Sequence, residues 1–383
     1  MKDGSDFMIY LDYAATTPMD EEAIEVFSQA SRSFFGNASS LHDIGSESAR
    51  LLNMSRQQLA EMLNLKKEAI LFTSGGSESN MLAIDTFVAS KPDWQNHLIV
   101  SRTEHASIAN FVCKLEQSGY EVTYLQHLED GRIDIEHLSE ALSEKTCLVI
   151  VQHVNSEIGV IQPIEQISKL VRKHQAFLHV DCVQSFSRLP LDGVSSLCDG
   201  MSISSHKVYG PKGTGAVIFP AIHQLKASIP NITHEFGFRP GTVDVPSIAS
   251  FVTAAKNCEN IIENEYERIS MLRMQLIQQL TEKEVDFQII GGGKTEQLPH
   301  ILALTFAGLQ GQYIMLELNR QGFAVSTGSA CQIGKQEPSK TMMAIGKSEE
   351  EAHQFVRLSF GKHTTTEDIQ KLADCLEGMV AIR

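Results

Sequence analysis

The chain has 383 residues, of which 42% are hydrophobic and 21% charged, so it can bury a sizeable core and is expected to form about two domains. Its 32 Lys and Arg against 47 Asp and Glu give a formal net charge of -15, which disfavours nucleic acid as a partner because polyphosphates are bound by clustered cations. The start, "MKDGSDFMIY", lacks the apolar segment of a secretion signal, and no run of about 18 apolar residues predicts a membrane span. We therefore expect a cytoplasmic globular protein that does not contact membranes.

The seven cysteines are scattered along the chain without any CxxC pair. An odd number with no metal-ligand spacing indicates free thiols, and it predicts neither a disulfide framework nor a resident metal site. Most of them are expected to be small buried hydrophobic residues. They are Cys113, Cys147, Cys182, Cys198, Cys258, Cys331 and Cys375.

Short apolar runs alternate with helix-like stretches from about Ile70 to Pro220, and they end in polar or glycine-rich loops. The runs are "ILFTSGGSES", "HLIVSRTEH", "CLVIVQHVNSEIG", "FLHVDCVQS", "GMSISSHK" and "GAVIF". This alternation predicts an α/β fold with a mostly parallel sheet covered by helices on both faces. The ligand site of such a sheet lies at the carboxyl ends of its strands, so the polar residues that close the runs are the candidates.

The first candidate loop, "FTSGGSESN", leads from a strand through Gly75, Gly76 and Ser77 into a helix expected to start near Glu78. Backbone N–H groups at that helix start, together with the Ser77 hydroxyl, predict a phosphate site, although a glycine turn also caps helices that bind nothing. Neither G-x-x-x-x-G-K-[ST] nor G-x-G-x-x-G occurs, which disfavours a nucleotide as the source of the phosphate.

Two further strand ends carry charged residues. "FLHVDCVQS" places Asp181 at the end of a buried-looking strand, with Gln184 just after it, and "GMSISSHK" brings Ser204, His206 and Lys207 to the same edge. A buried carboxylate needs a cationic or hydrogen-bonding partner, which a protonated pyridine nitrogen supplies. A lysine in such a loop is otherwise most often a solvated cation. Phosphate cradle, carboxylate and lysine together indicate pyridoxal 5′-phosphate (PLP) held as a Schiff base on Lys207.

The chemistry assigns a role to each of these groups. Burial and nearby cations are expected to lower the pKa of Lys207 from about 10.4, so that the amine can later act as a general acid and base. Asp181 is expected to keep the pyridine nitrogen protonated. His105, in "TEHASI", is placed to stack on the ring, although a lone histidine is more often structural.

A different pattern follows Ala255. Apolar residues at steps of three and four predict a long connecting helix through Ile262, Tyr266, Ile269, Leu272, Leu276 and Leu280. Beyond it, "VDFQIIG", "HILALTFAG" and "FVRLSFG" predict strands and "GQYIMLELNRQG" a helix, while Thr364 with Glu367 predicts a capping box for a final helix. We expect a large PLP-binding domain over residues 14–256 and a small α+β domain from residues 1–13 and 257–383, which carries the loop of Cys331.

The order of the motifs resembles the cysteine desulfurases, class-V aminotransferases in the aspartate-aminotransferase-like fold (fold type I) of PLP enzymes. The resemblance runs nearly end to end through "YLDYAATTP", "FGNASSLH", "FTSGGSESN", "TEHASI", "VNSEIGVIQ", "HVDCVQS", "SSHKVYGPKG", "RPGTVDVP", "STGSACQIG" and "FVRLSFG". It implies a homodimer in which Thr242 arrives from the partner subunit, with Asn155 near the ring hydroxyl or the substrate and Gln184 on the ring oxygen. The implied phosphate ligands are Gly76, Ser77, Ser204 and His206.

The resemblance also gives Cys331 its role. In the family, the thiolate of this cysteine attacks the sulfur of the substrate L-cysteine on the cofactor and yields alanine and an enzyme persulfide. The Cys331 pKa should therefore lie below about 8.5, or His105 should take its proton. The cysteine is expected on a flexible loop that can carry sulfur outward. Its neighbours are small, namely Gly328, Ser329, Ala330 and Gly334.

Arg357, in "FVRLSFG", is the candidate for binding the substrate carboxylate, since a guanidinium offers two parallel donors. The long interval from Cys331 to Arg357 resembles the iron-sulfur-assembly group. The sulfur acceptor is then an iron-sulfur scaffold, a thiouridylase or a client enzyme, and Cys331 is a candidate for transient ligation of an iron-sulfur cluster.

Some positions depart from the usual family pattern. The segment "THEFGFRPGT" carries a charged and aromatic run where a glycine- and glutamine-rich run is common, and we expect it to alter the dimer or partner surface but not the chemistry. The departing residues of this segment are His234, Glu235, Phe236 and Pro240. Ala38 and Ser156 depart from the pattern elsewhere in the chain.

Two other functions remain open at this point. An aminotransferase or selenocysteine lyase of the same fold needs no persulfide-forming thiol. A non-catalytic PLP-binding or sulfur-relay scaffold requires Lys207 or Asp181 to be dispensable.

Overall fold

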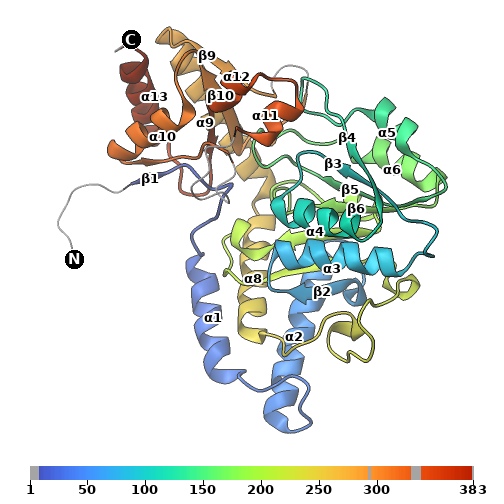
Figure 1. The fold of residues 1–383 in the computed structure, drawn as a ribbon. Coiled ribbons are helices and arrows are strands. Elements are labelled where there is room, and N and C mark those ends of the chain that lie inside the picture. The colour runs from blue at the N-terminus through green and yellow to red at the C-terminus, as the bar shows by residue number, and fades with distance from the viewer. Residues whose placement is uncertain (1–7, 292–294, 329–337, 382–383) are drawn as a thin grey trace.

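The computed structural model describes residues 8–291, 295–328 and 338–381 (Figure 1). Its larger part is built on a seven-stranded sheet in which β8 runs antiparallel to both neighbours and the other neighbouring pairs are parallel. The α/β fold with a mostly parallel sheet is therefore confirmed. In sheet order the strands are β2 (Ile70–Thr73), β8 (Gly215–Ile218), β7 (Gly200–Ser204), β6 (Phe177–Asp181), β5 (Thr146–Gln152), β3 (His97–Ser101) and β4 (Glu121–Leu125).

Continuous apolar strands form this sheet because both of its faces are covered. In β5, Val149 and Val151 belong to one core cluster, whereas Leu148 and Ile150 belong to another, as expected when successive side chains point to opposite faces. Helices α3 (Gly76–Ala89) and α4 (Ala106–Gln117) cover the second face. The first face is covered by α2 (Asp43–Met62), α5 (Ile135–Ala141), α6 (Ile164–Lys173) and α8 (Val245–Glu259).

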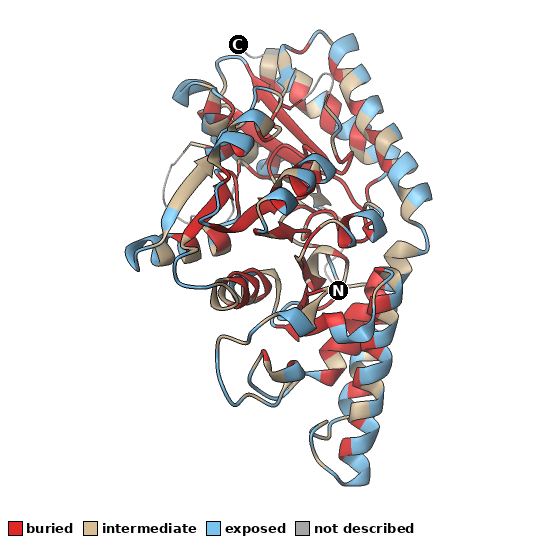
Figure 2. Cartoon of the chain, turned by 90° about the vertical axis from the view of Figure 1, so that its right-hand side faces the viewer, coloured by how far each residue is buried: buried red, intermediate tan, exposed pale blue. Residues whose placement is uncertain are grey.

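Helices α1 (Glu21–Ser33) and α2 both pack against α8 and lie together at one end of the molecule (Figure 1). The strands of the large sheet are largely buried except for the edge strand β4, while the outer faces of the helices are exposed (Figure 2). Shorter helices connect these elements: η1 (Lys67–Ala69), α7 (Asp192–Ser195), η2 (Ser205–Lys207), η3 (Ile222–Gln224) and η4 (Glu235–Gly237). In the described ranges, no helix is long and apolar enough to cross a bilayer.

The smaller part has its own sheets and its own core. An antiparallel sheet has the order β12 (Phe355–Ser359), β10 (Ile301–Phe306) and β9 (Phe287–Ile289), and β1 (Ile9–Tyr10) pairs in parallel with β11 (Phe323–Ala324). The long helix α9 (Ile262–Glu282) buries Ile269, Leu272, Leu276 and Leu280, while Tyr266 is exposed. The remaining helices are α10 (Gly311–Arg320), α11 (Lys340–Ala344), α12 (Glu349–His353) and α13 (Thr366–Ala381). The expected domain boundaries stay a prediction.

Two predicted helix starts are wrong by one or two residues. Helix α3 begins at Gly76 rather than near Glu78, because Gly75 adopts φ 143 and serves as its N-cap. The reciprocal cap of α13 is made by Thr365 and Asp368, whose side chains accept each other's backbone N–H at 3.2 and 2.8 Å. Thr364 instead accepts from the N–H of Gly361 at 3.0 Å.

Candidate active site

The carboxyl ends of the predicted strands meet at one edge of the large sheet. β6 ends at Asp181, which is paired with Ser202 of β7 and with Gln152 at the end of β5. β7 ends at Ser204 and continues directly into η2, which carries Lys207. A parallel arrangement places all these ends on the same side. The structure thus brings together the carboxylate, the lysine and the serine that the sequence predicted.

Lys207 is held in a site that disfavours its charge. Its Nζ donates to the backbone oxygens of Ala14 and Ala15, the latter at 2.8 Å. The pKa of Lys207 is lowered to about 7, first by burial and then by the positive charges of Arg357 and Arg188, which outweigh the opposite effect of Asp12 and Asp181. A large fraction of the amine is therefore neutral near pH 7, which is the form that attacks an aldehyde.

Asp181 is buried, with 7% of its surface exposed, and is held by uncharged donors. Its Oδ2 accepts from Asn80 Nδ2 at 2.8 Å, and its Oδ1 accepts from the N–H of Val183 at 2.9 Å. Asn80 in turn bonds His179 Nε2 at 3.0 Å. Within the described part of the chain, Asp181 has no cation at ion-pair distance, so its charge calls for a positive group on a ligand. Asn80, which reaches Asp181 from α3, was not singled out in advance, although "FTSGGSESN" ends with it.

A second unsatisfied group lies near the start of α3. Ser204 Oγ is buried and has no hydrogen-bond partner in the described chain. A Cβ at Gly76 would lie 3.9 Å from this oxygen and 2.8 Å from Val183 Cγ2, so position 76 requires glycine. Ser77 is exposed in the first turn of α3, and His206 Nδ1 bonds Thr16 Oγ1 at 3.1 Å. Free N–H groups at a helix start and an unpartnered hydroxyl suit a phosphate.

Three other predicted residues also have defined positions. His105 is the N-cap of α4: its Nδ1 accepts from the N–H of Ser107 at 3.1 Å, and its side chain is exposed. Gln184 Nε2 donates at 2.9 Å to the oxygen of Ala14, which also accepts from Lys207.

Asn155 is buried, and its Oδ1 accepts from the N–H groups of Glu157 and Ile158, both at 2.9 Å. Its Nδ2 has only a 3.4 Å contact to Thr341 Oγ1, which leaves this end of the amide free to serve a ligand. The roles assigned to His105, Gln184 and Asn155 stay predictions.

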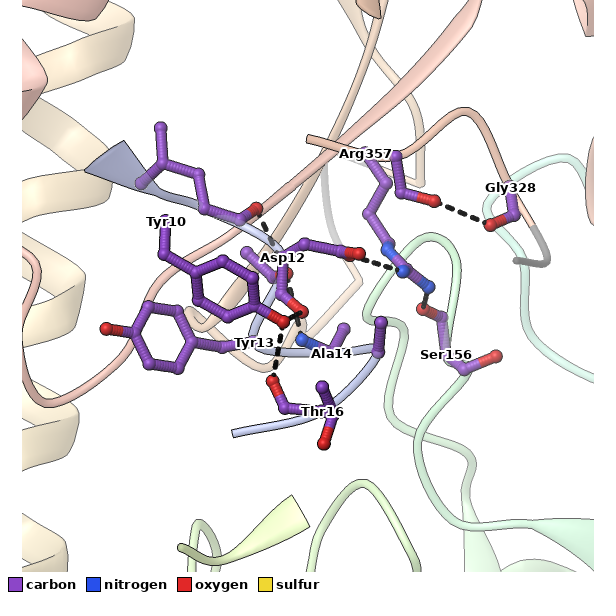
Figure 3. Close-up of polar contacts among 12 residues, drawn as sticks. Tyr10, Asp12, Tyr13, Ala14, Thr16, Ser156, Gly328 and Arg357 are labelled. Carbon is purple, nitrogen blue, oxygen red and sulfur yellow. Dashed lines mark hydrogen bonds and ion pairs between the residues drawn. The ribbon is translucent and has the colours of Figure 1, made fainter. Parts of the chain in front are cut away.

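Arg357 comes from β12 of the small sheet and lies between Asp12 and Ser156 (Figure 3). Its Nη2 is 2.8 Å from Asp12 Oδ1, its Nη1 donates to the oxygen of Ser156 at 2.9 Å, and its buried Nε has no partner in the described ranges. These two contacts hold the guanidinium on two sides and leave its Nε–H and the second N–H of each terminal nitrogen for a ligand carboxylate. Asp12 was not singled out from the sequence, although "YLDYAATTP" contains it.

Two predicted groups are not brought to this edge by the described chain. Thr242 is exposed in the segment between η4 and α8, and its arrival from a second copy stays a prediction. Cys331 lies outside the described residues, as do Ser329, Ala330 and Gly334. The segments on either side approach one loop of the large part, since Ser339 Oγ donates to Glu157 Oε2 at 2.6 Å and a Cβ on Gly328 would lie 3.5 Å from Glu157 Oε1.

The segment that departs from the family pattern is anchored by a buried ion pair. Arg56 Nη1 and Nη2 lie 2.8 and 2.6 Å from the two Glu235 oxygens, and the N–H of Phe72 donates to the same carboxylate at 2.7 Å. Phe236 and Phe72 lie on the guanidinium at 5.0 and 4.8 Å. Arg239 Nε further along is 2.7 Å from Glu78 of α3. The segment leading to Thr242 is thereby attached to α2 and α3.

The comparisons with known proteins agree with this geometry. The aminotransferase class-V family model matches residues 9–372, so the chain belongs to that family. It is 43% identical over 366 residues to the putative cysteine desulfurase NifS of Bacillus subtilis (strain 168), which covers 95% of this chain and 93% of that protein. Within the family, the chain therefore belongs to the cysteine desulfurases, which are enzymes.

Solved structures give the same result for the fold. A NifS-like protein superposes with a TM-score of 0.90 at 26% identity, covering 98% of this chain and all 100% of the other. The structure described as SspA in complex with cysteine has a TM-score of 0.80 at 31% identity and covers 93% of this chain and 100% of the other. The family uses PLP, and the residues present fit this cofactor, because in the described chain Asp181 lacks a cation and the Ser204 hydroxyl lacks a hydrogen-bond partner.

In the described ranges, no group of three or more His, Cys, Asp or Glu side chains is arranged to hold a metal ion. The described cysteines are free thiols, of which Cys113 is exposed and Cys147, Cys182 and Cys198 are buried.

Proposed function

We propose that this chain acts on L-cysteine, releases L-alanine and holds the sulfur as a persulfide on Cys331. The observation that carries this proposal is the pair formed by Lys207, whose pKa is about 7, and the cation-free carboxylate of Asp181 at the same sheet edge. Membership of the cysteine desulfurases and the likeness to a structure solved with cysteine support the choice of substrate.

PLP, when bound, accepts electron density from the bonds of the substrate α-carbon. The neutral Nζ of Lys207 binds the cofactor and, once released, takes a proton from the α-carbon and returns one to the product. Asp181 keeps the pyridine nitrogen protonated through a charge-assisted hydrogen bond. The groups that hold the phosphate are Gly76, Ser77, Ser204, His206 and Thr242 of the partner subunit.

The ring and the substrate are oriented by neighbouring side chains. His105 stacks on the ring, Gln184 Nε2 donates to the ring oxygen, and Asn155 Nδ2 donates to the ring hydroxyl region or the substrate. Arg357 binds the substrate carboxylate through Nε and the unused N–H groups of its fork, while Asp12 holds it in place.

Sulfur transfer needs no external oxidant. The thiolate of Cys331 attacks the substrate sulfur, so an S–S bond forms and the Cβ–S bond breaks. The electron pair of the broken bond stays with the carbon, which takes up one proton to become the methyl group of alanine. Carbon is thus reduced while sulfur is oxidised to the persulfide level. His105 is placed to take the thiol proton.

The wider setting of the reaction belongs to the same proposal. The enzyme works as a homodimer in the cytoplasm, with a large domain of residues 14–256 and a small domain of residues 1–13 and 257–383. Its persulfide serves an acceptor such as an iron-sulfur scaffold, a thiouridylase or a client enzyme, and Cys331 ligates a cluster transiently during such a transfer.

The test uses the purified holoenzyme with L-cysteine and dithiothreitol, and measures alanine and sulfide. The wild type should form both in equal amounts, Cys331→Ala should form neither, and the matched control Cys113→Ala, at an exposed cysteine, should match the wild type. Full sulfide release by Cys331→Ala would contradict the proposal. A keto acid without sulfide would indicate an aminotransferase, and activity on L-selenocysteine that survives in Cys331→Ala would indicate a selenocysteine lyase.

A further inference from the structure

A buried arginine links the lysine site to the N-terminal segment. Arg188 is 7% exposed, and its Nη1 donates to Gln184 Oε1 at 2.9 Å. Its Nη2 donates to the backbone oxygens of Lys207 at 3.0 Å and Tyr13 at 3.3 Å. All three acceptors are uncharged. One guanidinium therefore holds a predicted cofactor ligand and the main chain of the catalytic lysine together.

The charge of Arg188 is not neutralised by an ion pair. Asp20 and Glu265 line a cavity of about 30 Å³ together with Arg188, but Asp20 pairs with Lys362 and Glu265 pairs with Arg268. In residues 8–291, 295–328 and 338–381, Arg188 has no carboxylate at ion-pair distance. Burying an unpaired charge is costly, so this arginine is expected to serve the site it touches.

The contact with Gln184 fixes which end of the amide faces the site. A guanidinium only donates hydrogen bonds, so the atom of Gln184 that faces Arg188 has to be the amide oxygen. Nε2 then points to the oxygen of Ala14, where Lys207 Nζ also donates. Arg188 thus turns the N–H end of the Gln184 amide toward the lysine. A ring oxygen requires this end of the amide because it accepts hydrogen bonds.

Among the charged groups around Lys207 in the described chain, Arg188 is the one whose charge is not matched by an opposite charge. Arg357 is paired with Asp12, and Asp181 faces the place expected for the pyridine nitrogen. His105 and His206 are further titratable groups beside the lysine.

We propose that Arg188 is a positioning residue of the Lys207 site: it orients the Gln184 amide, holds the Lys207 main chain and keeps an unneutralised positive charge beside the amine. This inference rests on the proposed role of Lys207 in binding PLP. Arg188 does not touch the reacting atoms. It acts by keeping Lys207 neutral at the pH at which the lysine has to attack the aldehyde, a direction that agrees with the lowered pKa of Lys207.

The test follows the binding of PLP to the apoenzyme, because the rate depends on the neutral fraction of the lysine. Association rates are measured across a pH series for the wild type, Arg188→Met and Arg188→Lys, together with the visible absorption band of the bound cofactor. The wild type should show an inflection near pH 7. Arg188→Lys should show its inflection at nearly the same pH. Arg188→Met should shift the inflection upward by about one pH unit and slow the association of PLP about tenfold at neutral pH.

If Arg188→Met folds and its PLP association rate shows the same inflection pH as the wild type, the inference is overturned. If Arg188→Met does not fold, Arg188→Gln takes its place, since glutamine keeps an N–H donor but loses the charge, and the same upward shift is expected. Loss of PLP binding or of alanine formation in the wild type would instead contradict the proposed function. An active wild type whose curve is shared by all the variants would contradict only the role of Arg188.

Discussion

The lysine of the cofactor site and the arginine of the substrate site treat their charges in opposite ways. Lys207 is buried beside the positive charges of Arg357 and Arg188, so its pKa falls to about 7. Arg357 is more deeply buried by area, and Asp12 pairs with it at 2.8 Å. The comparison shows how a largely neutral amine and a permanent cation are provided near each other: in the described chain an ion-pair partner is supplied to Arg357 and not to Lys207.

The two groups also differ in how the chain builds them. Lys207 and Asp181 stand at the ends of neighbouring strands of one sheet, whereas Arg357 belongs to β12 and is held by Asp12 from the N-terminal segment. Changes at the sheet edge should therefore alter the binding of PLP, and changes at the Asp12–Arg357 pair should alter the binding of substrate. The predictions below test this division.

Lys207→Ala should have the largest effect. Without the amine, the visible absorption band of the lysine-bound cofactor should disappear, and alanine formation should fall at least about 10³-fold. Spectra and alanine release measure the two effects, with Lys212→Ala as the control because Lys212 is exposed in the same loop. Retention of the band in Lys207→Ala would move the cofactor to another lysine.

Arg357→Lys should reduce kcat/KM for L-cysteine about 100-fold, mainly through KM, because an ammonium cannot replace the two-pronged donor set. The absorption spectrum of the bound cofactor should stay unchanged. Steady-state kinetics with spectra recorded on the same sample check the prediction. A loss of cofactor with an unaltered KM would mean that Arg357 belongs to the cofactor site and that the proposed division is wrong.

Asp12→Asn should have a smaller effect of the same kind. It removes the counter-charge of Arg357 but keeps a hydrogen-bond acceptor, so kcat/KM should fall about tenfold, in line with a charged hydrogen bond worth about 1.5 kcal/mol. The matched control is Asp43→Asn, at an exposed position in the first turn of α2. An effect on PLP affinity larger than on KM would count against the assigned role of Asp12.

Asn80→Ala should have the smallest effect, and this effect should be on the binding of PLP and not on the binding of substrate. Asn80 donates one hydrogen bond to Asp181, so its loss should weaken PLP binding by about fivefold, corresponding to about 1 kcal/mol, and leave the KM for L-cysteine unchanged. Equilibrium titration of the apoenzyme with PLP measures the change, with the exposed Asn53→Ala of α2 as control. An unchanged PLP affinity would show that Asn80 does not support Asp181.

The sequence predicted the groups that follow from local rules. Asp181 and Ser204 end buried strands, and Lys207 follows Ser204 in η2. Parallel strands bring such ends to one edge, so their meeting required no knowledge of distant contacts. The glycine turn before α3 was also recognised locally, and Gly75 adopts φ 143 there. The capping pair of α13 was misplaced by one residue because Thr364, Thr365 and Thr366 are equivalent by propensity alone.

The partners that support these groups depended on tertiary packing. Asp12 meets Arg357 across 345 positions of the chain, and Glu235 meets Arg56 across 179, so no local pattern indicates either pair. Arg188 follows Gln184 closely in sequence, but its importance comes from the absence of a nearby carboxylate in the described chain, which only the folded surroundings reveal. Cys331, predicted as the nucleophile, lies outside the described residues.

The most direct measurement of the central claim is the identity of the lysine that carries the cofactor. The holoenzyme is reduced with borohydride, which fixes the cofactor covalently, then digested and analysed by peptide mass spectrometry. The structure predicts a phosphopyridoxyl group on Lys207 alone, in the peptide that contains η2. Modification of Lys212 or of another lysine, or no modification of a yellow protein, would contradict this account.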